Sequence, residues 1–347
     1  MPNRNIYKYD EMKRREHMAV RETVGWYLFT HHLIEVTGPD ATAFLDKLCP
    51  KNIASLAVGR ERYTTMLTEK AEIMDDVVVF RIDEGTYWVS TLFANKQVEW
   101  MRDHSEGFDV QWKVITQDWH MYAIQGPKSL ELVNALVKKP VDDLKFFAFE
   151  SNAIEGAQVM VNRAGFTGEK LGYEIYMHPD FCDRFEELIR EKGEPLGAVQ
   201  VTDIQLMVWT LPTEAGFWYM RDLQHLNPFE AGVDKGIDFT KDFIGKKPLM
   251  RIKKKGGAQR ELVPFTVDED DVFIHGHDLG GGGDYVFKDG EEVGRVWKFN
   301  FSFVIDKNYG YILAKKGGLD VGDKVIITPH EGSARRYEGT IVEKVAL

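Results

Sequence analysis

The chain of 347 residues has only two cysteines, Cys49 and Cys182, and neither stands in a CxxC or Cys/His spacing. A disulfide framework or a zinc site is therefore not indicated. Long apolar runs are also missing: no stretch approaches the ~20 residues that a membrane-spanning helix needs. The charged N-terminus has no apolar core of signal-peptide length. We therefore expect a cytoplasmic protein that does not act in a membrane.

An excess of positive charge is missing as well. The 44 lysines and arginines stand against 55 acidic residues, which gives a net charge of -11. This balance argues against a nucleic-acid partner. One basic run, residues 251–257, ends in two glycines, and we interpret it as a solvated linker between two domains.

Several common catalytic motifs are absent. No serine or cysteine stands in a nucleophile-elbow pattern, so the sequence does not support a hydrolase. His275 and His277 form an HxH pair without a third ligand at a suitable spacing, and we expect no metal. The run Gly280–Gly283 lacks the strand and helix that a phosphate-binding loop requires, so we interpret it as a plain loop.

The patterns that are present predict a mixed α+β fold. Residues 76–82 and 86–90 are two β-rich runs joined by a short turn, which predicts a hairpin. Helices are predicted at 92–102 and 128–138, and strands at 158–162 and 173–177. Short strand-like segments separated by turn residues follow residue 258, as in a small β-barrel. We therefore divide the chain into a region of two interleaved subdomains, 1–250, and a barrel domain, 258–347.

The pair Asp75 and Asp76 opens an apolar strand. This position would place a carboxylate at the mouth of a sheet, where burial can raise its pKa or a cationic substrate can pair with it. A turn pair that caps the strand is an equally good interpretation. Residue chemistry alone leaves both open.

The segment 63–80, YTTMLTEKAEIMDDVVVF, resembles the folate-site segment of the aminomethyltransferase (glycine-cleavage T-protein) family. Further similar segments follow in the family's order: 124–129, 144–149, 162–169, 172–176, 227–232 and 242–246. The resemblance implies a three-lobed fold with a central channel that binds tetrahydrofolate, followed by the C-terminal β-barrel.

The resemblance also implies roles for particular residues. Asp76 matches the family's catalytic aspartate beside the reactive N5 and N10 atoms of the folate. Glu174 matches the carboxylate that pairs with the pterin ring, and such a pair suits two N–H donors. The other matching positions around the folate are Tyr63, Val78, Phe147 and Phe166. For Phe147, an ordinary place in the core is nearly as good an interpretation.

The sequence departs from the family pattern at several points. An arginine of the folate site is replaced by Thr202, which leaves the contact to the glutamate tail undefined. The barrel carries Trp297–Phe299 in place of the family motif. Trp218, Tyr219 and Trp297 would suit a cationic or aryl methyl donor through cation–π contacts or stacking. A hydrophobic core is the alternative for these aromatics.

Segments 124–132, 138–150 and 171–177 are similar to the tetrahydrofolate-dependent demethylase branch, which includes dimethylsulfoniopropionate demethylases and aryl O-demethylases. We therefore expect a methyltransferase that moves a methyl group from a small O-, S- or N-methyl substrate to tetrahydrofolate. A lipoyl carrier protein is not expected as a partner. The alternatives are a glycine-cleavage aminomethyltransferase, which transfers a methylene unit, and a folate-binding protein without catalysis.

Overall fold

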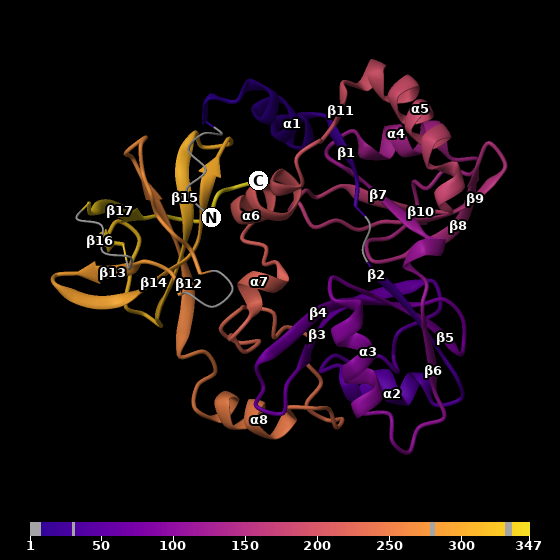
Figure 1. Ribbon diagram of the computed structural model, residues 1–347, viewed down its shortest axis with the longest axis horizontal. Helices are drawn as coiled ribbons and strands as arrows, with labels where there is room; N and C mark the ends of the chain where they lie inside the picture. Colours follow the sequence, from indigo (N-terminus) through magenta and orange to yellow (C-terminus); the bar gives the residue numbers. More distant parts are fainter. Residues whose placement is uncertain (1–7, 30–31, 278–281, 330–334) are drawn as a thin grey trace.

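Three groups of strands form the framework of the computed structural model, which describes residues 8–29, 32–277, 282–329 and 335–347. A five-stranded sheet, a six-stranded sheet and a closed barrel occupy separate regions, and the short helices α6 (Leu211–Ala215) and α7 (Met220–Leu223) lie between them (Figure 1). The predicted α+β class with a C-terminal barrel is confirmed. The expected glycine loop at 280–283 falls partly outside the described residues.

The five-stranded sheet has the order β3-β4-β5-β2-β6, and every neighbouring pair is antiparallel. Its elements are β2 (His32–Thr37), α2 (Ala41–Leu48), β3 (Arg60–Leu67), β4 (Ile73–Arg81), β5 (Thr86–Thr91), α3 (Ala94–Asp103) and β6 (Gln111–Val114). Side chains alternate along β4: Val77 and Val79 belong to the core that includes α2 and α3, whereas Val78 packs against a different cluster. Successive residues of a strand point to opposite faces, so this sheet has two buried faces.

The hairpin predicted from the sequence is formed by β4 and β5, with Arg81 opposite Tyr87. The backbone N–H of Gly85 donates to Asp83 Oδ1 at 2.9 Å, which stabilises the turn. The hairpin holds β4 in the middle part of the sheet, between β3 and β5.

The six-stranded sheet has the order β11-β1-β7-β10-β9-β8. Only the β1–β11 pair among these strands is parallel. Its elements are α1 (Glu11–Glu22), β1 (Val24–Leu28), β7 (His120–Gln125), α4 (Ser129–Leu136), β8 (Phe149–Ile154), β9 (Ala157–Asn162), β10 (Gly172–Met177), α5 (Cys182–Gly193) and β11 (Ala198–Gln200). Leu132 from α4 and Phe185 from α5 pack with Tyr173 and Ile175 of β10 in one core. Strand β10 is therefore held between two strands and under two helices.

The barrel closes in the order β12-β15-β14-β13-β16-β17. Its strands are β12 (Arg260–Val267), β13 (Tyr285–Lys288), β14 (Glu291–Ser302), β15 (Lys307–Lys315), β16 (Lys324–Thr328) and β17 (Tyr337–Ile341). In the described part of the chain, no helix is long and apolar enough to cross a membrane.

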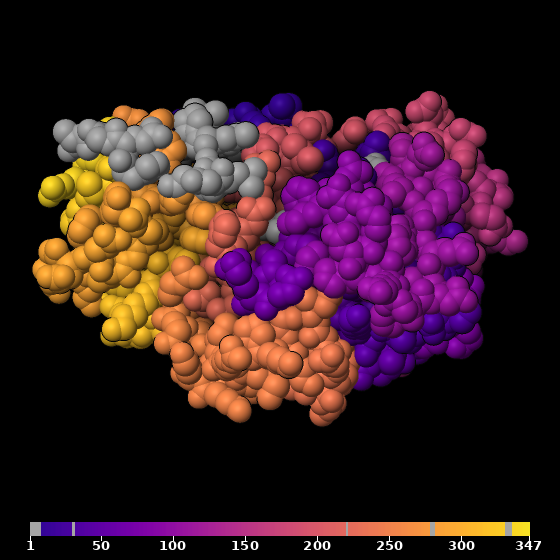
Figure 2. Space-filling view, turned by 60° about the horizontal axis from the view of Figure 1, so that its bottom comes forward, coloured from indigo at the N-terminus to yellow at the C-terminus, as the bar shows by residue number. Residues whose placement is uncertain are grey.

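The basic run at 251–257 is not the linker predicted from the sequence. Residues Lys246–Lys254 form helix α8 (Figure 1), and residues 251–254 of the run are its last turn. The orange atoms at the lower edge of Figure 2 show that this part of the chain reaches the surface. Leu249 is fully buried, and Ile252 packs against the same cluster. Lys253 Nζ lies 4.2 Å from the centre of the Phe239 ring. The basic side chains are therefore the outer face of an amphipathic helix, which sequence composition alone did not separate from a linker.

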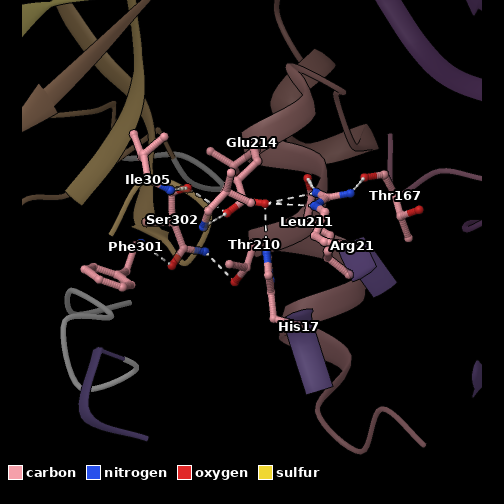
Figure 3. Close-up of polar contacts among 12 residues, drawn as sticks. His17, Arg21, Thr167, Thr210, Leu211, Glu214, Phe301, Ser302 and Ile305 are labelled. Atoms are coloured by element: carbon pink, nitrogen blue, oxygen red, sulfur yellow. Dashed lines mark hydrogen bonds and ion pairs between the residues drawn. The ribbon is translucent and has the colours of Figure 1, made fainter. Parts of the chain in front are cut away.

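A buried charge network joins α1, α6 and β14 (Figure 3). Glu214 Oε2 lies 2.8 Å from His17 Nε2 and accepts a hydrogen bond from Arg21 Nη2 at 3.0 Å. Its Oε1 accepts from Ser302 Oγ at 2.7 Å. Burial alone would raise the pKa of Glu214, but His17, Arg21 and Ser302 outweigh it and lower this pKa to about 2. The network fixes the barrel against the N-terminal helix.

Candidate active site

A cavity of about 140 Å³ lies where the five-stranded and six-stranded sheets approach each other. Its wall combines side chains from β3, β4, β5 and β10 with two loop segments, 164–166 and 217–219. Three carboxylic acids line it: Glu61, Asp76 and Glu174. Among the described residues, no lysine or arginine lines this cavity. Its chemistry therefore suits a ligand rich in N–H donors or one that carries positive charge.

Asp76 projects from β4 into the cavity. Its Oδ2 accepts a hydrogen bond of 3.4 Å from the hydroxyl of Tyr63, on the neighbouring strand β3. Burial and the nearby charge of Asp75 raise the pKa of Asp76 to about 8, although the Tyr63 hydrogen bond opposes the rise. Asp76 can therefore exchange a proton close to neutral pH.

Glu174 lies in the middle of β10 and is 7% exposed. Its Oε2 accepts hydrogen bonds of 3.1 Å from both Asn162 Nδ2 and the hydroxyl of Tyr176. Burial raises the pKa of Glu174, and these two hydrogen bonds counteract part of that effect. The two bonds hold the carboxyl group in one orientation toward the cavity.

Aromatic side chains form much of the remaining wall. Phe166 lies in the loop before β10, and the ring centres of Phe166 and Tyr219 are 6.5 Å apart in an edge-to-face contact. The buried amide of Gln125 supports this loop, since it donates to the carbonyl oxygen of Ala164 at 3.1 Å. Phe147 has a positive φ of 58°, an uncommon backbone conformation for a bulky residue that tends to occur at functional sites.

The structure brings together most of the residues singled out from the sequence. Eight of them line the cavity: Tyr63, Asp76, Val78, Phe147, Phe166, Glu174, Trp218 and Tyr219. Phe147 is in the wall rather than in any of the core clusters among the described residues.

Trp297 is the exception, because it does not reach the cavity. It is 6% exposed, its Nε1 donates to the carbonyl oxygen of Asp222 at 2.6 Å, and its ring stacks on His277 with centres 3.9 Å apart. It therefore belongs to the core between the barrel and α7 and is not part of the cavity wall. Among the described residues, no group of three potential ligands could hold a metal ion.

Thr202 stands where the family resemblance implied an arginine. Its backbone N–H and its hydroxyl donate to Glu16 at 2.9 and 2.7 Å. Thr202 is thus engaged with α1, and it does not line the cavity.

The wall also contains polar residues that sequence patterns did not identify, among them Glu61 and Tyr176. Each of these two lies two positions from a predicted site residue in the same strand, Tyr63 in β3 and Glu174 in β10. Side chains two apart in a strand share a face. The two-residue periodicity of each strand was therefore the sequence signal that could have identified both residues.

Two larger hollows adjoin the cavity. One of about 400 Å³ shares Tyr63, Phe217 and Trp218 with it, and one of about 740 Å³ shares Glu61, Tyr63 and Phe147. Small-molecule sites usually measure roughly 300–1,000 Å³. The cavity alone suits a ring system, and the hollows leave room for the rest of a larger ligand and for a second substrate.

Residues 2–241 match the family described as the GCVT N-terminal domain, which covers more than half of the chain. The chain therefore belongs to the GCVT aminomethyltransferase family. It is 30% identical over 341 residues to the aminomethyltransferase of Thermotoga maritima, across 95% of this chain and 88% of that protein. It is 31% identical over 323 residues to the aminomethyltransferase of Bacillus subtilis, across 90% and 85% of the two chains.

A solved structure agrees with this fold. The crystal structure of the glycine cleavage system aminomethyltransferase T from Bartonella henselae matches with a TM-score of 0.81 at 21% sequence identity, over 96% of this chain and 89% of that one. Proteins of the GCVT family use tetrahydrofolate, so the predicted cofactor is confirmed. The chain is a tetrahydrofolate-dependent one-carbon transferase. These relatives do not distinguish the demethylase branch from the aminomethyltransferases.

The residues of the cavity fit tetrahydrofolate. A reduced pterin ring presents several N–H groups, and ionised carboxylates are pure acceptors. Glu61 and Glu174 supply such acceptors at one end of the β3–β4 ladder, where Glu61 pairs with Phe80. Asp76 lies four ladder pairs away, opposite Thr65. The carboxylates are therefore spaced along the cavity and not gathered at one point.

Proposed function

We propose that the protein catalyses aminomethyl transfer, in which a one-carbon unit passes from an aminomethyl donor to tetrahydrofolate with release of ammonia. The support for this reaction comes from the relatives: the proteins from Thermotoga maritima and Bacillus subtilis, both named aminomethyltransferase, match nearly the whole chain. The cavity adds a carboxyl group, Asp76, that can take up a proton near neutral pH.

Bound tetrahydrofolate supplies the nucleophilic nitrogen that accepts the one-carbon unit. In this proposal, Glu174 binds the aminopyrimidine edge, and Tyr176 and Asn162 keep its carboxyl group in place. Asp76 accepts the proton that the reacting nitrogen loses, and Tyr63 orients Asp76 through its hydroxyl. Most of the rate would come from positioning, because alignment of two bound reactants supplies a large part of the barrier reduction.

The aromatic side of the site favours a second candidate, methyl transfer from a small O-, S- or N-methyl compound. Trp218 and Phe217 line both the cavity and the 400 Å³ hollow, and Phe229 lines that hollow as well. Aromatic faces attract sulfonium and methylammonium groups and stack on aryl ethers. This candidate needs no carrier protein, whereas aminomethyl transfer calls for a donor held by a lipoyl carrier.

Product analysis tests the two candidates. The protein is incubated with tetrahydrofolate and either an aminomethylated lipoyl carrier protein or a panel of methoxyaryl, sulfonium and methylamine compounds. Aminomethyl transfer yields 5,10-methylenetetrahydrofolate, ammonia and the carrier with its lipoyl group as a dithiol. Methyl transfer yields 5-methyltetrahydrofolate and the demethylated compound. Formation of 5-methyltetrahydrofolate alone would overturn the first candidate in favour of the second.

A binding measurement accompanies the product analysis. Tetrahydrofolate should raise the melting temperature, since a ligand that binds only the folded state at 100 times its Kd stabilises it by about 2.7 kcal/mol. An unchanged melting temperature together with no product in either assay would contradict both candidates.

A further inference from the structure

Glu61 is a third carboxylic acid in the cavity wall. It lies in β3, two residues before Tyr63, and its side chain lines the cavity. Glu61 is 4% exposed, so its carboxyl group is almost fully removed from bulk water. A buried carboxyl group needs hydrogen-bond donors or a proton to offset the loss of hydration.

The carboxyl oxygens of Glu61 have too few hydrogen-bond donors around them. The side-chain amide of Asn162 donates to Glu61 Oε2 at 2.9 Å, and the same nitrogen donates to Glu174 Oε2 at 3.1 Å. Within the described part of the chain, Glu61 Oε1 has no hydrogen-bond partner. One amide group thus serves two carboxyl groups, and one buried oxygen has no donor.

The charges that face Glu61 come from several elements. Burial raises the pKa of Glu61 most, and the charge of Glu174 on β10 raises it further. Asn162 at the end of β9 and Arg60 on β3 lower this pKa, but it stays well above the usual range. Tyr176 supplies a hydroxyl to Glu174 and not to Glu61. Two carboxyl groups that share one site do not both ionise readily. The pair of carboxyl groups therefore holds a proton more readily than an isolated carboxyl group does.

We propose that Glu61 is a second acceptor for tetrahydrofolate, so that Glu61 and Glu174 together bind the N–H groups of the aminopyrimidine edge. This inference rests on tetrahydrofolate occupying the cavity, as in the proposed function. The edge carries a ring N–H and an exocyclic amino group, which supply the donors that the two carboxyl groups lack. Ligand donors favour the ionised form of both groups, so binding releases the shared proton.

Glu61→Gln tests the proposal, because it keeps the size of the side chain but removes an acceptor and the shared proton. The affinity for tetrahydrofolate should fall at least tenfold, which is about 1.4 kcal/mol. Calorimetry at pH 7 in two buffers of different ionisation enthalpy should show that the wild type releases up to about one proton and that the variant releases clearly less. Glu84→Gln is the control, since the Glu84 side chain is 87% exposed at a hairpin turn.

Three results would overturn the proposal. One is a Glu61→Gln variant that binds tetrahydrofolate within twofold of the wild type. Another is a wild type that binds tetrahydrofolate without proton release at pH 7, a result that needs no folded variant. The third is equal proton release by the wild type and the variant. Each of these results leaves the proposed function standing, because tetrahydrofolate still binds. A wild type that fails to bind tetrahydrofolate would overturn the proposed function too. Failure of the proposed function is therefore distinguishable from failure of the role of Glu61.

Discussion

Asp75 and Asp76 are neighbours in β4, yet their carboxyl groups serve different sides of the sheet. Asp75 is fully buried, and its Oδ2 accepts hydrogen bonds from Thr91 Oγ1 at 2.6 Å and Gln97 Nε2 at 2.5 Å. Asp76 faces the cavity and accepts from Tyr63. The alternation of side chains along a strand produces this separation. One carboxyl oxygen of Asp75, Oδ2, is thus bound by two donors inside the protein, whereas Asp76 is the member of the pair that lines the cavity.

Asp76→Asn should lower turnover by roughly two orders of magnitude or more, with a much smaller change in folate affinity. Asparagine keeps the shape and one hydrogen-bonding oxygen, but it neither carries the negative charge nor accepts a proton. Steady-state kcat together with a direct Kd measurement separates the two effects.

Asp75→Asn is the matched control for that variant. It disturbs the hydrogen bonds to Thr91 and Gln97, so it should lower the melting temperature. At pH 9, where Asp76 is ionised with or without the charge of Asp75, the turnover of the folded protein should stay close to that of the wild type. The assignment of Asp76 is wrong if Asp76→Asn keeps full turnover while Asp75→Asn loses it.

The pH dependence of kcat/KM should also report Asp76. Its pKa in the free protein is raised to about 8, chiefly by burial. A carboxyl group with this pKa is neutral below pH 8 and becomes a competent base above it. The value of kcat/KM should therefore rise with pH and level off above about 8. This rise of kcat/KM should be absent in Asp76→Asn. A wild-type kcat/KM that does not change from pH 6 to 9 would contradict the role of Asp76 as a base.

Glu174→Ala should weaken tetrahydrofolate binding by about 2 kcal/mol or more, because ligand donors in a buried site would lose a charged acceptor. Tyr176→Phe offers a graded comparison. It removes one of the two hydrogen bonds that orient Glu174, so the loss should be smaller, about 1 kcal/mol. Isothermal titration calorimetry gives the tetrahydrofolate affinities of both variants and so their order. Equal affinities for the wild type and Glu174→Ala would place Glu174 outside the site.

Local sequence signals were sufficient for part of the fold and of the site. The hairpin of β4 and β5 follows from two β-rich runs around Asp83–Gly85, since both the strands and the turn are encoded within a few residues. The positions of Asp76 and Glu174 came from resemblance to a family, and alternation along β3 and β10 would have added Glu61 and Tyr176.

Long-range packing decided the features that sequence patterns did not predict. Helix α8 forms because Leu249 and Ile252 have a hydrophobic cluster to pack against, and a count of basic residues does not contain that information. Trp297 belongs to β14 at a point where the register with β15 shifts between Val296 and Lys298. Such an irregularity changes which way a side chain faces, so an aromatic motif in the barrel does not by itself indicate a substrate contact.

The charge network around Glu214 should contribute strongly to stability at neutral pH. Glu214→Gln removes one of the two carboxylates that pair with the buried side chain of Arg21, while Glu169 remains at 2.6 Å. Loss of the charged acceptor at 3.0 Å should cost roughly 2 kcal/mol. Glu187→Gln is the control: its ion pair with Arg184 lies at the surface, where such pairs contribute at most about 1 kcal/mol. Urea unfolding at pH 7 measures both changes.

Acid should remove the difference between the wild type and Glu214→Gln. The pKa of Glu214 is lowered to about 2 from the ordinary value of 4.5, so its ionised form stabilises the folded state above pH 4.5. This contribution is lost as pH falls from about 4.5 to about 2, since the unfolded chain takes up the proton first. The two unfolding free energies should therefore converge over this window, whereas glutamine at 214 has no proton to gain. A gap between the two proteins that stays constant from pH 7 to pH 3 would show that Glu214 acts through its shape and hydrogen bonds and not through its charge.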